Sequence, residues 1–400
     1  MINNRFVHMF SWGLLYSLFS LGIIGLYKIL LKSDRIICIK FLGRKRSRIH
    51  VSDCIIYLII TIVSAIRLNT GSDFYNYYLY FNNINDNFLS VKEILFKPQN
   101  GYLVLSYIIK LITDYQYAIF IVIAIFSYAY LFHLIRTEVD NTSCALLCYF
   151  FLGYYAYSNN ILRQYIAMSF VMCAYINFNH KNYIKCAILS CLAVSFHYSS
   201  AIVLIIMYFI KNFKPTFNKF ILAIMSGFTG IVSLNFLFKI FVKLIPSAAG
   251  YEKYMNWRRS GQLRLILAVI GMCLIYGVLT YVILKYKDKI KEKNELRYRE
   301  IIFLILGLCI NIISIRQWII NRVAIYFYQF IILILPVMFS VIDRKSRAKL
   351  KVSLYTFMFL YMIFSSVFLG ENEYYSYDTV FSGNSPISDV EYNIIHGWGN

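Results

Sequence analysis

Residues 116–136 read QYAIFIVIAIFSYAYLFHLIR, an apolar run in which the only Lys or Arg is the last residue. A helix of about 20 apolar residues crosses the hydrocarbon core of a bilayer. The run is therefore predicted to be a transmembrane helix. Similar runs, several of them shorter, recur along the chain, and we expect about twelve spans at 10–31, 51–66, 116–136, 143–157, 161–178, 183–197, 199–210, 217–245, 263–285, 300–315, 323–341 and 352–370.

The composition excludes a water-soluble fold. Of 400 residues, 60% are hydrophobic and 15% are charged, and the mean hydropathy is +0.61. Soluble proteins carry roughly 45–50% apolar and about 25% charged residues. Only 5 Pro and 18 Gly are present, which excludes a disordered, linker-rich chain. We predict an all-α polytopic membrane protein, with residues 1–400 forming a single integral membrane domain.

The positions of the Lys and Arg residues, which give the chain a net charge of +21, indicate the orientation of these spans. Lys and Arg accumulate in cytoplasmic loops, so this excess gives no reason to expect nucleic acid as a partner. Placing the basic stretches 32–50, 285–299 and 343–351 in the cytoplasm leaves both termini outside, including an acidic tail at 371–400. Residues 67–115 then form an outer loop, whose apolar piece 101–113 is expected to be a re-entrant or interfacial helix.

No metal or cofactor is expected. The nine cysteines form no CxxC pair, and most lie inside apolar runs, where they act as small core residues. The chain also contains no DxD, HExxH, Walker loop, GxSxG or strand-linked GxGxxG motif.

Two outer segments carry charged residues beside aromatic ones. Residues 66–78 contain Arg67, Asp73, Tyr77 and Tyr78 after the second span. Asp73 is either a base or the partner of an arginine, and the tyrosines offer stacking faces and hydroxyls to a sugar. The alternative is an interfacial aromatic belt with a structural Arg–Asp pair. Residues 316–326 place Arg316 and Arg322 around a short outer turn, where topological anchoring is the alternative reading.

Residues 158–167 favour an anion. Arg163 and Gln164 lie in the first turn of the fifth span, where free backbone N–H groups and the helix dipole attract negative charge. A guanidinium adds a planar fork that matches phosphate, although Arg163 could also extend to the membrane surface. His197, between two apolar runs, could donate to a phosphate, shuttle a proton, or serve as a structural residue.

The ionisable residues on the outer side indicate a shared site for an anionic ligand. Charges embedded in a membrane are costly and are functional candidates by default. Arg258 and Arg259, in the longest outer loop between helices, are more simply explained as contacts with solvent or lipid headgroups.

The order of these motifs resembles the EpsG family of Wzy-like bacterial polysaccharide polymerases. The resemblance runs from about residue 60 to residue 340. It departs from the usual pattern at residues 92–101, where a Glu directly before the Gly-Tyr pair would be usual and Gln99 and Asn100 precede Gly101 instead. Its motifs are Arg67 with Gly71-Ser72-Asp73 and Tyr77-Tyr78, Gly101-Tyr102, Asn160 to Ala167, Phe196 to Ser199, Asn321-Arg322 with Tyr326, and Pro336.

This resemblance implies a Wzy-like or GT-C-like metal-independent glycosyltransferase of the bacterial inner membrane. It would move a growing glycan from undecaprenyl diphosphate to the non-reducing end of another lipid-linked repeat unit, at the periplasmic or outer face. A chain-length regulator is an expected partner, and O-antigen, capsule and exopolysaccharide are all open as products. The expected catalytic residues are Arg163, His197, Asp73 and Arg322, and the expected substrate contacts are Arg67, Gln164, Tyr77, Tyr78, Tyr165, Arg316 and Tyr326.

Two other functions remain open from the sequence. One is a different lipid-linked glycan transferase, such as a ligase that moves finished glycan to a lipid core. The other is a transporter of lipid-linked sugars. Transporters often contain two related halves, and the arginine motifs do not repeat between residues 1–200 and 201–400.

Overall fold

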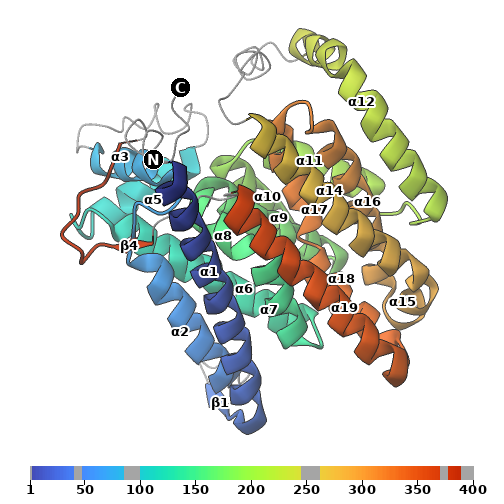
Figure 1. Ribbon diagram of the computed structural model, residues 1–400, viewed down its shortest axis with the longest axis horizontal. Helices are drawn as coiled ribbons and strands as arrows, with labels where there is room; N and C mark the ends of the chain where they lie inside the picture. Colours follow the sequence, from blue (N-terminus) through green and yellow to red (C-terminus); the bar gives the residue numbers. More distant parts are fainter. Residues whose placement is uncertain (1, 40–46, 85–99, 245–261, 370–376, 389–400) are drawn as a thin grey trace. The chain divides into compact units, whose positions relative to one another are not determined.

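The computed structural model describes residues 2–39, 47–84, 100–244, 262–369 and 377–388. These residues form two compact units. Their helices and strands are labelled in Figure 1. Unit 1 contains the described residues up to Leu204 together with 377–388, and unit 2 contains those from Ile205 to 369. The predicted single membrane domain therefore stays a prediction, and each unit is considered by itself.

Unit 1 is helical, with two short antiparallel strand pairs. Strand β1 (Ile36–Ile39) pairs with β2 (Ser47–His50), and β3 (Arg67–Leu68) pairs with β4 (Asp378–Thr379). Its helices are α1 (Ile2–Leu30), α2 (Val51–Ala65), α3 (Phe74–Asn82), α5 (Asn100–Lys110), α6 (Ala118–Glu138), α7 (Thr142–Phe151), α8 (Tyr154–Asn160), α9 (Leu162–Asn179), α10 (Tyr183–Phe196) and the first half of α11 (Ser199–Ile210).

The predicted span 143–157 is two helices in the structure. Helix α7 ends at Phe151, and α8 begins at Tyr154 after Gly153, which has a φ of 81°. Most side chains on both sides of this break are buried, including Phe150 and Tyr155. The interruption therefore lies inside the protein, where neighbouring groups can satisfy the freed backbone.

Unit 2 is also helical. Its helices are α12 (Phe217–Leu244), α14 (Gln262–Lys285), α15 (Lys287–Lys293), α16 (Glu295–Ile313), a 3-10 turn (Trp318–Ile320), α17 (Asn321–Tyr328), α18 (Ile331–Val341) and α19 (Arg344–Ile363), which continues as a π-helical turn (Phe364–Leu369). Tyr276 of α14 stacks on Tyr328 of α17 with ring centroids 3.6 Å apart. Arg297 and Glu300 form a buried ion pair on α16.

By length and composition, five described helices can cross a membrane. A sixth candidate is the pair Trp318–Tyr328 and Ile331–Val341, which bends by 46°. Four shorter apolar helices coincide with predicted spans: α2, α7, α10 and α11. The all-α membrane architecture is thus confirmed in its coarse form, while the number of twelve spans stays a prediction.

Candidate functional site

Arg67 lies just beyond the end of α2 and is held in place by backbone groups. Its side chain is only 2% exposed. The guanidinium donates to the carbonyl of Ser64 and, at 3.1 Å, to that of Asn159, and it lies 5.0 Å from the ring centroid of Phe120. A buried guanidinium is stable only with such partners. These contacts join α2, α6 and α8 around one positive charge.

The turn after Arg67 packs on Asn160. The Oδ1 atom of Asn160 accepts hydrogen bonds from the hydroxyl of Ser72 (3.4 Å) and the backbone N–H of Asp73 (3.3 Å). Gly71 has a φ of 92°, and a Cβ there would lie 3.0 Å from the same Oδ1. The position therefore favours glycine for both its backbone conformation and its close approach. Asn160 thereby fixes the backbone of half-buried Asp73, where α3 begins.

Arg163 faces the tyrosines of α3. Its guanidinium carbon lies 5.7 Å from the ring centroids of both Tyr77 and Tyr80, within the range of a cation–π contact. The Nε atom of Arg163 is buried and has no hydrogen-bond partner among the residues described. Arg163 is thus half-buried and positioned mainly by the tyrosines of α3.

Helix α5 connects this region to His197. The hydroxyl of Tyr102 donates to the carbonyl of Tyr77 at 3.1 Å. Gly101 is so close to α10 that a Cβ would lie 2.6 Å from the Ser195 hydroxyl and 2.9 Å from the Phe196 ring. Tyr77, Tyr102 and Phe196 belong to one buried hydrophobic cluster, which also contains the neighbour of Arg163 on α9, Leu162. Sequence motifs more than 90 residues apart are therefore assembled around a common core.

His197 is half-buried at the junction of α10 and α11. Its Nδ1 lies 2.6 Å from the hydroxyl of Ser199, and its carbonyl accepts a hydrogen bond from the hydroxyl of Ser200. The Nδ1 contact orients the imidazole ring, and the Ser200 contact holds the backbone at the start of α11.

The remaining predicted residues of unit 1 have mainly internal contacts. Gln164 and Tyr165 are buried, and the hydroxyl of Tyr165 donates to that of Tyr149 at 3.0 Å. The hydroxyl of Tyr78 donates to Oε1 of Gln116 at 2.9 Å. Contacts of these three residues with substrate stay predictions.

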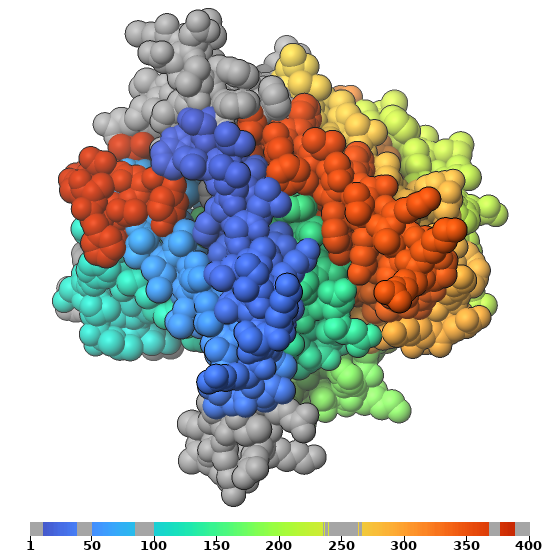
Figure 2. Space-filling view, turned by 60° about the horizontal axis from the view of Figure 1, so that its bottom comes forward, coloured from blue at the N-terminus to red at the C-terminus, as the bar shows by residue number. Residues whose placement is uncertain are grey.

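The C-terminal segment 377–388 folds onto the Arg67 region, a contact that the sequence did not reveal. In the β3–β4 pair, Arg67 is the register partner of Thr379, and the Val380 N–H donates to the carbonyl of Ile66. The hydroxyl of Tyr377 donates to the carbonyl of Val63 at 2.6 Å. Figure 2 shows this segment as the red patch beside the blue and cyan surface of unit 1.

Tyr377 remains protonated at physiological pH. Burial raises the pKa of Tyr377 to about 12, and the positive charge of Arg67 only partly opposes that rise. The phenol is therefore a hydrogen-bond donor rather than a counter-ion of Arg67.

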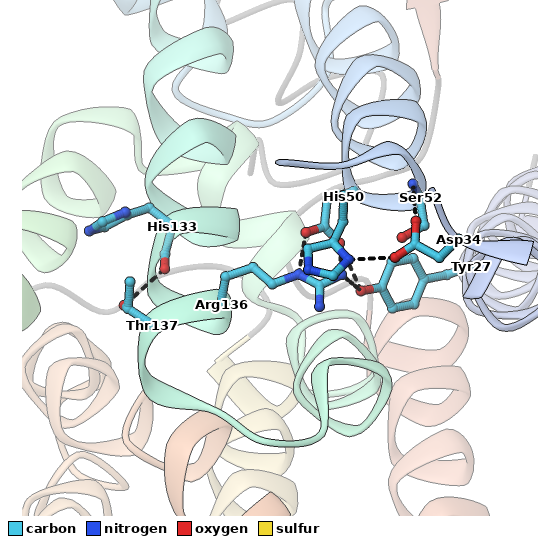
Figure 3. Close-up of polar contacts among 8 residues, drawn as sticks. Tyr27, Asp34, His50, Ser52, His133, Arg136 and Thr137 are labelled. Atoms are coloured by element: carbon cyan, nitrogen blue, oxygen red, sulfur yellow. Dashed lines mark hydrogen bonds and ion pairs between the residues drawn. The ribbon is translucent and has the colours of Figure 1, made fainter. Parts of the chain in front are cut away.

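A second polar cluster lies at the opposite end of α2 (Figure 3). Arg136 of α6 donates to both carboxylate oxygens of Asp53, and the hydroxyl of Tyr27 donates to Asp53 at 2.8 Å. Nearby, Asp34 contacts His50 and accepts from the Ser52 N–H. These contacts tie α1, α2 and α6 together.

Across the part of the chain that the structure describes, no three His, Cys, Asp or Glu side chains are grouped as metal ligands.

The predicted site residues of unit 2 lie around the 3-10 turn. Arg316 is exposed, Arg322 lies 5.5 Å from the ring centroid of Trp318, and Tyr326 is fully buried. The meeting of Arg322 with Arg163 of unit 1 stays a prediction. Arg258 and Arg259 lie outside the described residues.

A comparison with known protein families shows which family contains these motifs. The family model with the description "EpsG family" matches residues 50–379, which include every predicted site residue and strand β4. The chain belongs to the EpsG family. The resemblance inferred from the motifs is therefore confirmed, and membership of the EpsG family points to a membrane-embedded, Wzy-like polysaccharide polymerase. Searches of curated proteins and of solved structures gave no match.

Proposed function

We propose that this EpsG-family protein polymerises lipid-linked repeat units at the outer face of the bacterial inner membrane. It transfers a growing glycan from undecaprenyl diphosphate to the non-reducing sugar of another lipid-linked unit. The observation that carries the proposal is the assembly of the Arg67 turn, Arg163 and the α10–α11 junction around α3 and α5. The proposed architecture is GT-C-like with about twelve spans, and the transfer is metal-independent.

The arginines have the chemistry to bind the departing diphosphate. As the bond between the sugar C1 and the diphosphate oxygen breaks, the electron pair leaves with the diphosphate. Arg163, a half-buried guanidinium beside Tyr77 and Tyr80, stabilises that charge through its planar fork. Arg67 adds a fixed positive charge, and Arg322 with Arg316 would contribute from unit 2. The sugar passes through an oxocarbenium-like transition state, as in glycoside hydrolysis.

The acceptor hydroxyl forms the new bond to C1 and gives up its proton. His197 is the proposed base, because the contact of Nδ1 with Ser199 orients the ring at the half-buried junction of α10 and α11. Asp73 is the proposed sugar-binding carboxylate, since its backbone is fixed by Asn160 at the start of α3. Half-buried Tyr78 supplies an aromatic face to the sugars, while buried Tyr77 contributes through its contact with the Arg163 guanidinium.

A ligase would use the same donor with a different lipid acceptor, so the product distinguishes the two activities. The test is expression in a matched polymerase-null strain, followed by gel analysis of glycan chain length. We expect a ladder of long chains with the wild-type protein. No elongation beyond that of the same strain without the protein would reject the polymerase and leave the ligase and the transporter as the candidates.

Arg163→Ala should abolish the ladder, and Arg163→Lys should strongly shorten it, since a lysine keeps the charge but loses the bidentate fork. Arg299→Lys is the matched control, because Arg299 is an exposed residue paired with Glu295 on α16. Wild-type chain lengths from a normally expressed Arg163→Ala protein would contradict the proposed phosphate site.

A further inference from the structure

Unit 1 contains a cavity of about 330 Å³ next to Arg67, within the range of roughly 300–1,000 Å³ that is typical of ligand pockets. One wall is α1, with Trp12, Leu15 and Phe19. Opposite it lie Val63 and Arg67 at the end of α2, with further lining residues Tyr16, Ser64, Thr70, Tyr155, Asn159 and Tyr377. The cavity therefore involves α1 and the C-terminal segment, neither of which the motifs indicated.

The walls offer hydrocarbon and aromatic surface. Tyr16 stacks on Tyr155 with centroids 6.2 Å apart, and Phe19 lies 5.7 Å from the same ring. The polar groups at the base form bonds within the protein: Ser64 with Tyr128, and Tyr377 with Val63. A ligand here gains contact with carbon atoms rather than hydrogen bonds.

Helix α1 is a candidate membrane span from Ser11 to Ser33, and Leu15 is 51% exposed. Figure 2 shows α1 as a continuous blue column across the surface of unit 1. A cavity with apolar walls does not hold water, so a neighbouring hydrocarbon chain is its natural occupant.

We propose that this cavity binds the isoprenoid chain of the lipid-linked substrate, next to the carbon that carries the phosphate. The inference deepens the proposed function and depends on it. Arg67 lines the cavity and is also a proposed diphosphate contact, so the chain of a donor bound there would extend into this cavity. Because lipid tails are as apolar as the cavity, fit to the aromatic rings provides the selection rather than the hydrophobic effect.

The binding test uses the full-length protein in nanodiscs that contain undecaprenyl phosphate and phosphatidylglycerol. A photo-reactive p-benzoylphenylalanine replaces Phe19 in one variant and Leu18 in another, since Leu18 is 55% exposed on the same helix and does not line the cavity. We expect the position 19 variant to give an adduct with the mass of undecaprenyl phosphate and the position 18 variant to give mainly phospholipid adducts. Phospholipid adducts alone at position 19 would overturn the inference.

The kinetic test uses a substitution that narrows the cavity. Leu15→Trp should raise KM for a lipid-linked substrate with the full isoprenoid chain about tenfold, a change of about 1.4 kcal/mol. It should leave KM for a short-chain analogue unchanged, and the control Leu18→Trp should alter neither value. Equal KM values for the two variants on the long-chain substrate would contradict the chain site.

These two tests separate the inference from the proposed function. Adduct formation at position 19 without any polymerisation by the wild-type protein would support the lipid site and reject the polymerase. Polymerisation by the wild-type protein, with neither the adduct nor an effect of Leu15→Trp, would reject the chain site alone.

Discussion

Asn69 and Ile387 are joined by a hydrogen bond from the Ile387 N–H to the Oδ1 atom of Asn69 at 3.0 Å. The amide of the same side chain donates to the carbonyl of Ser385 at 3.1 Å. Asn69 thus binds the C-terminal segment through both ends of its amide, two residues after Arg67. It also has a φ of 53°, a left-handed conformation that Asn tolerates better than most residues.

Replacing Asn69 should release the C-terminal segment. Asn69→Ala removes two hydrogen bonds worth about 1 kcal/mol each and leaves an unfavourable φ. Asn69→Gly removes the same hydrogen bonds, but glycine adopts a positive φ without strain, so this variant should be less destabilised. Thermal unfolding in detergent and limited proteolysis within residues 377–388 provide the measurements. Equal melting temperatures and cleavage rates for Asn69→Ala and the wild type would contradict this anchoring.

Gly71→Ala should lower both stability and polymerisation. The new Cβ is strained at a φ of 92° and contacts Asn160, which positions Asp73. Such strain costs about 1–3 kcal/mol. Gly383→Ala is the matched control, because Gly383 also has a positive φ, 79°, but a Cβ added there would meet no atom of the described residues within 4 Å. Similar losses from both variants would show that backbone strain, and not the contact with Asn160, is responsible.

His197→Ala should lose more turnover than Asp73→Asn. The imidazole is oriented by Ser199 for proton transfer, whereas Asp73 is expected to bind sugar hydroxyls, so Asp73→Asn should chiefly raise KM. Reconstituted assays with lipid-linked repeat units at saturating substrate measure the difference. An inactive Asp73→Asn protein beside a nearly normal His197→Ala protein would reverse the two assignments.

The proposed orientation can be tested with an impermeant thiol reagent on intact cells. Cysteines introduced at Ser72 or Ser385 should react from outside, and one at Lys291 should not, because Lys291 lies in a predicted cytoplasmic basic stretch. Native Cys191 is exposed and should first be replaced by serine. Labelling at position 291 from the outside would reject the outward-facing site.

The long apolar runs predicted the helices well, because a chain segment inside a membrane has to satisfy its backbone hydrogen bonds internally. The predicted span 116–136 is α6, Ala118–Glu138, and 183–197 is α10, Tyr183–Phe196. The break at Gly153 was missed, since an apolar run continues through it and only buried neighbours make the interruption tolerable.

The candidate site was only partly predictable from the sequence. Local motifs predicted Arg67 and Arg163 as anion-binding candidates and Asp73 as a base or the partner of an arginine. They could not identify Asn160 as the acceptor for the Asp73 backbone, nor the pairing of Thr379 with Arg67. A strand of two residues is too short to show the alternating pattern of a β-strand, so its pairing with a distant strand cannot be recognised in the sequence. The contribution of α1 to the cavity was equally hidden, because a lipid-facing and a cavity-facing leucine look alike in sequence.

The pairing of β3 with β4 also has a consequence for biosynthesis. Asn69 and Ser385 are 316 residues apart, and at roughly 5–20 residues per second the ribosome needs about 15–60 s to make the intervening chain. During that time the Arg67 segment has left the ribosome without its partner strand. The positively charged turn is completed only after the helices of unit 2 have been synthesised, so a nascent chain lacks the finished pocket. The cavity beside Arg67 is therefore completed only when the C-terminal segment has been made.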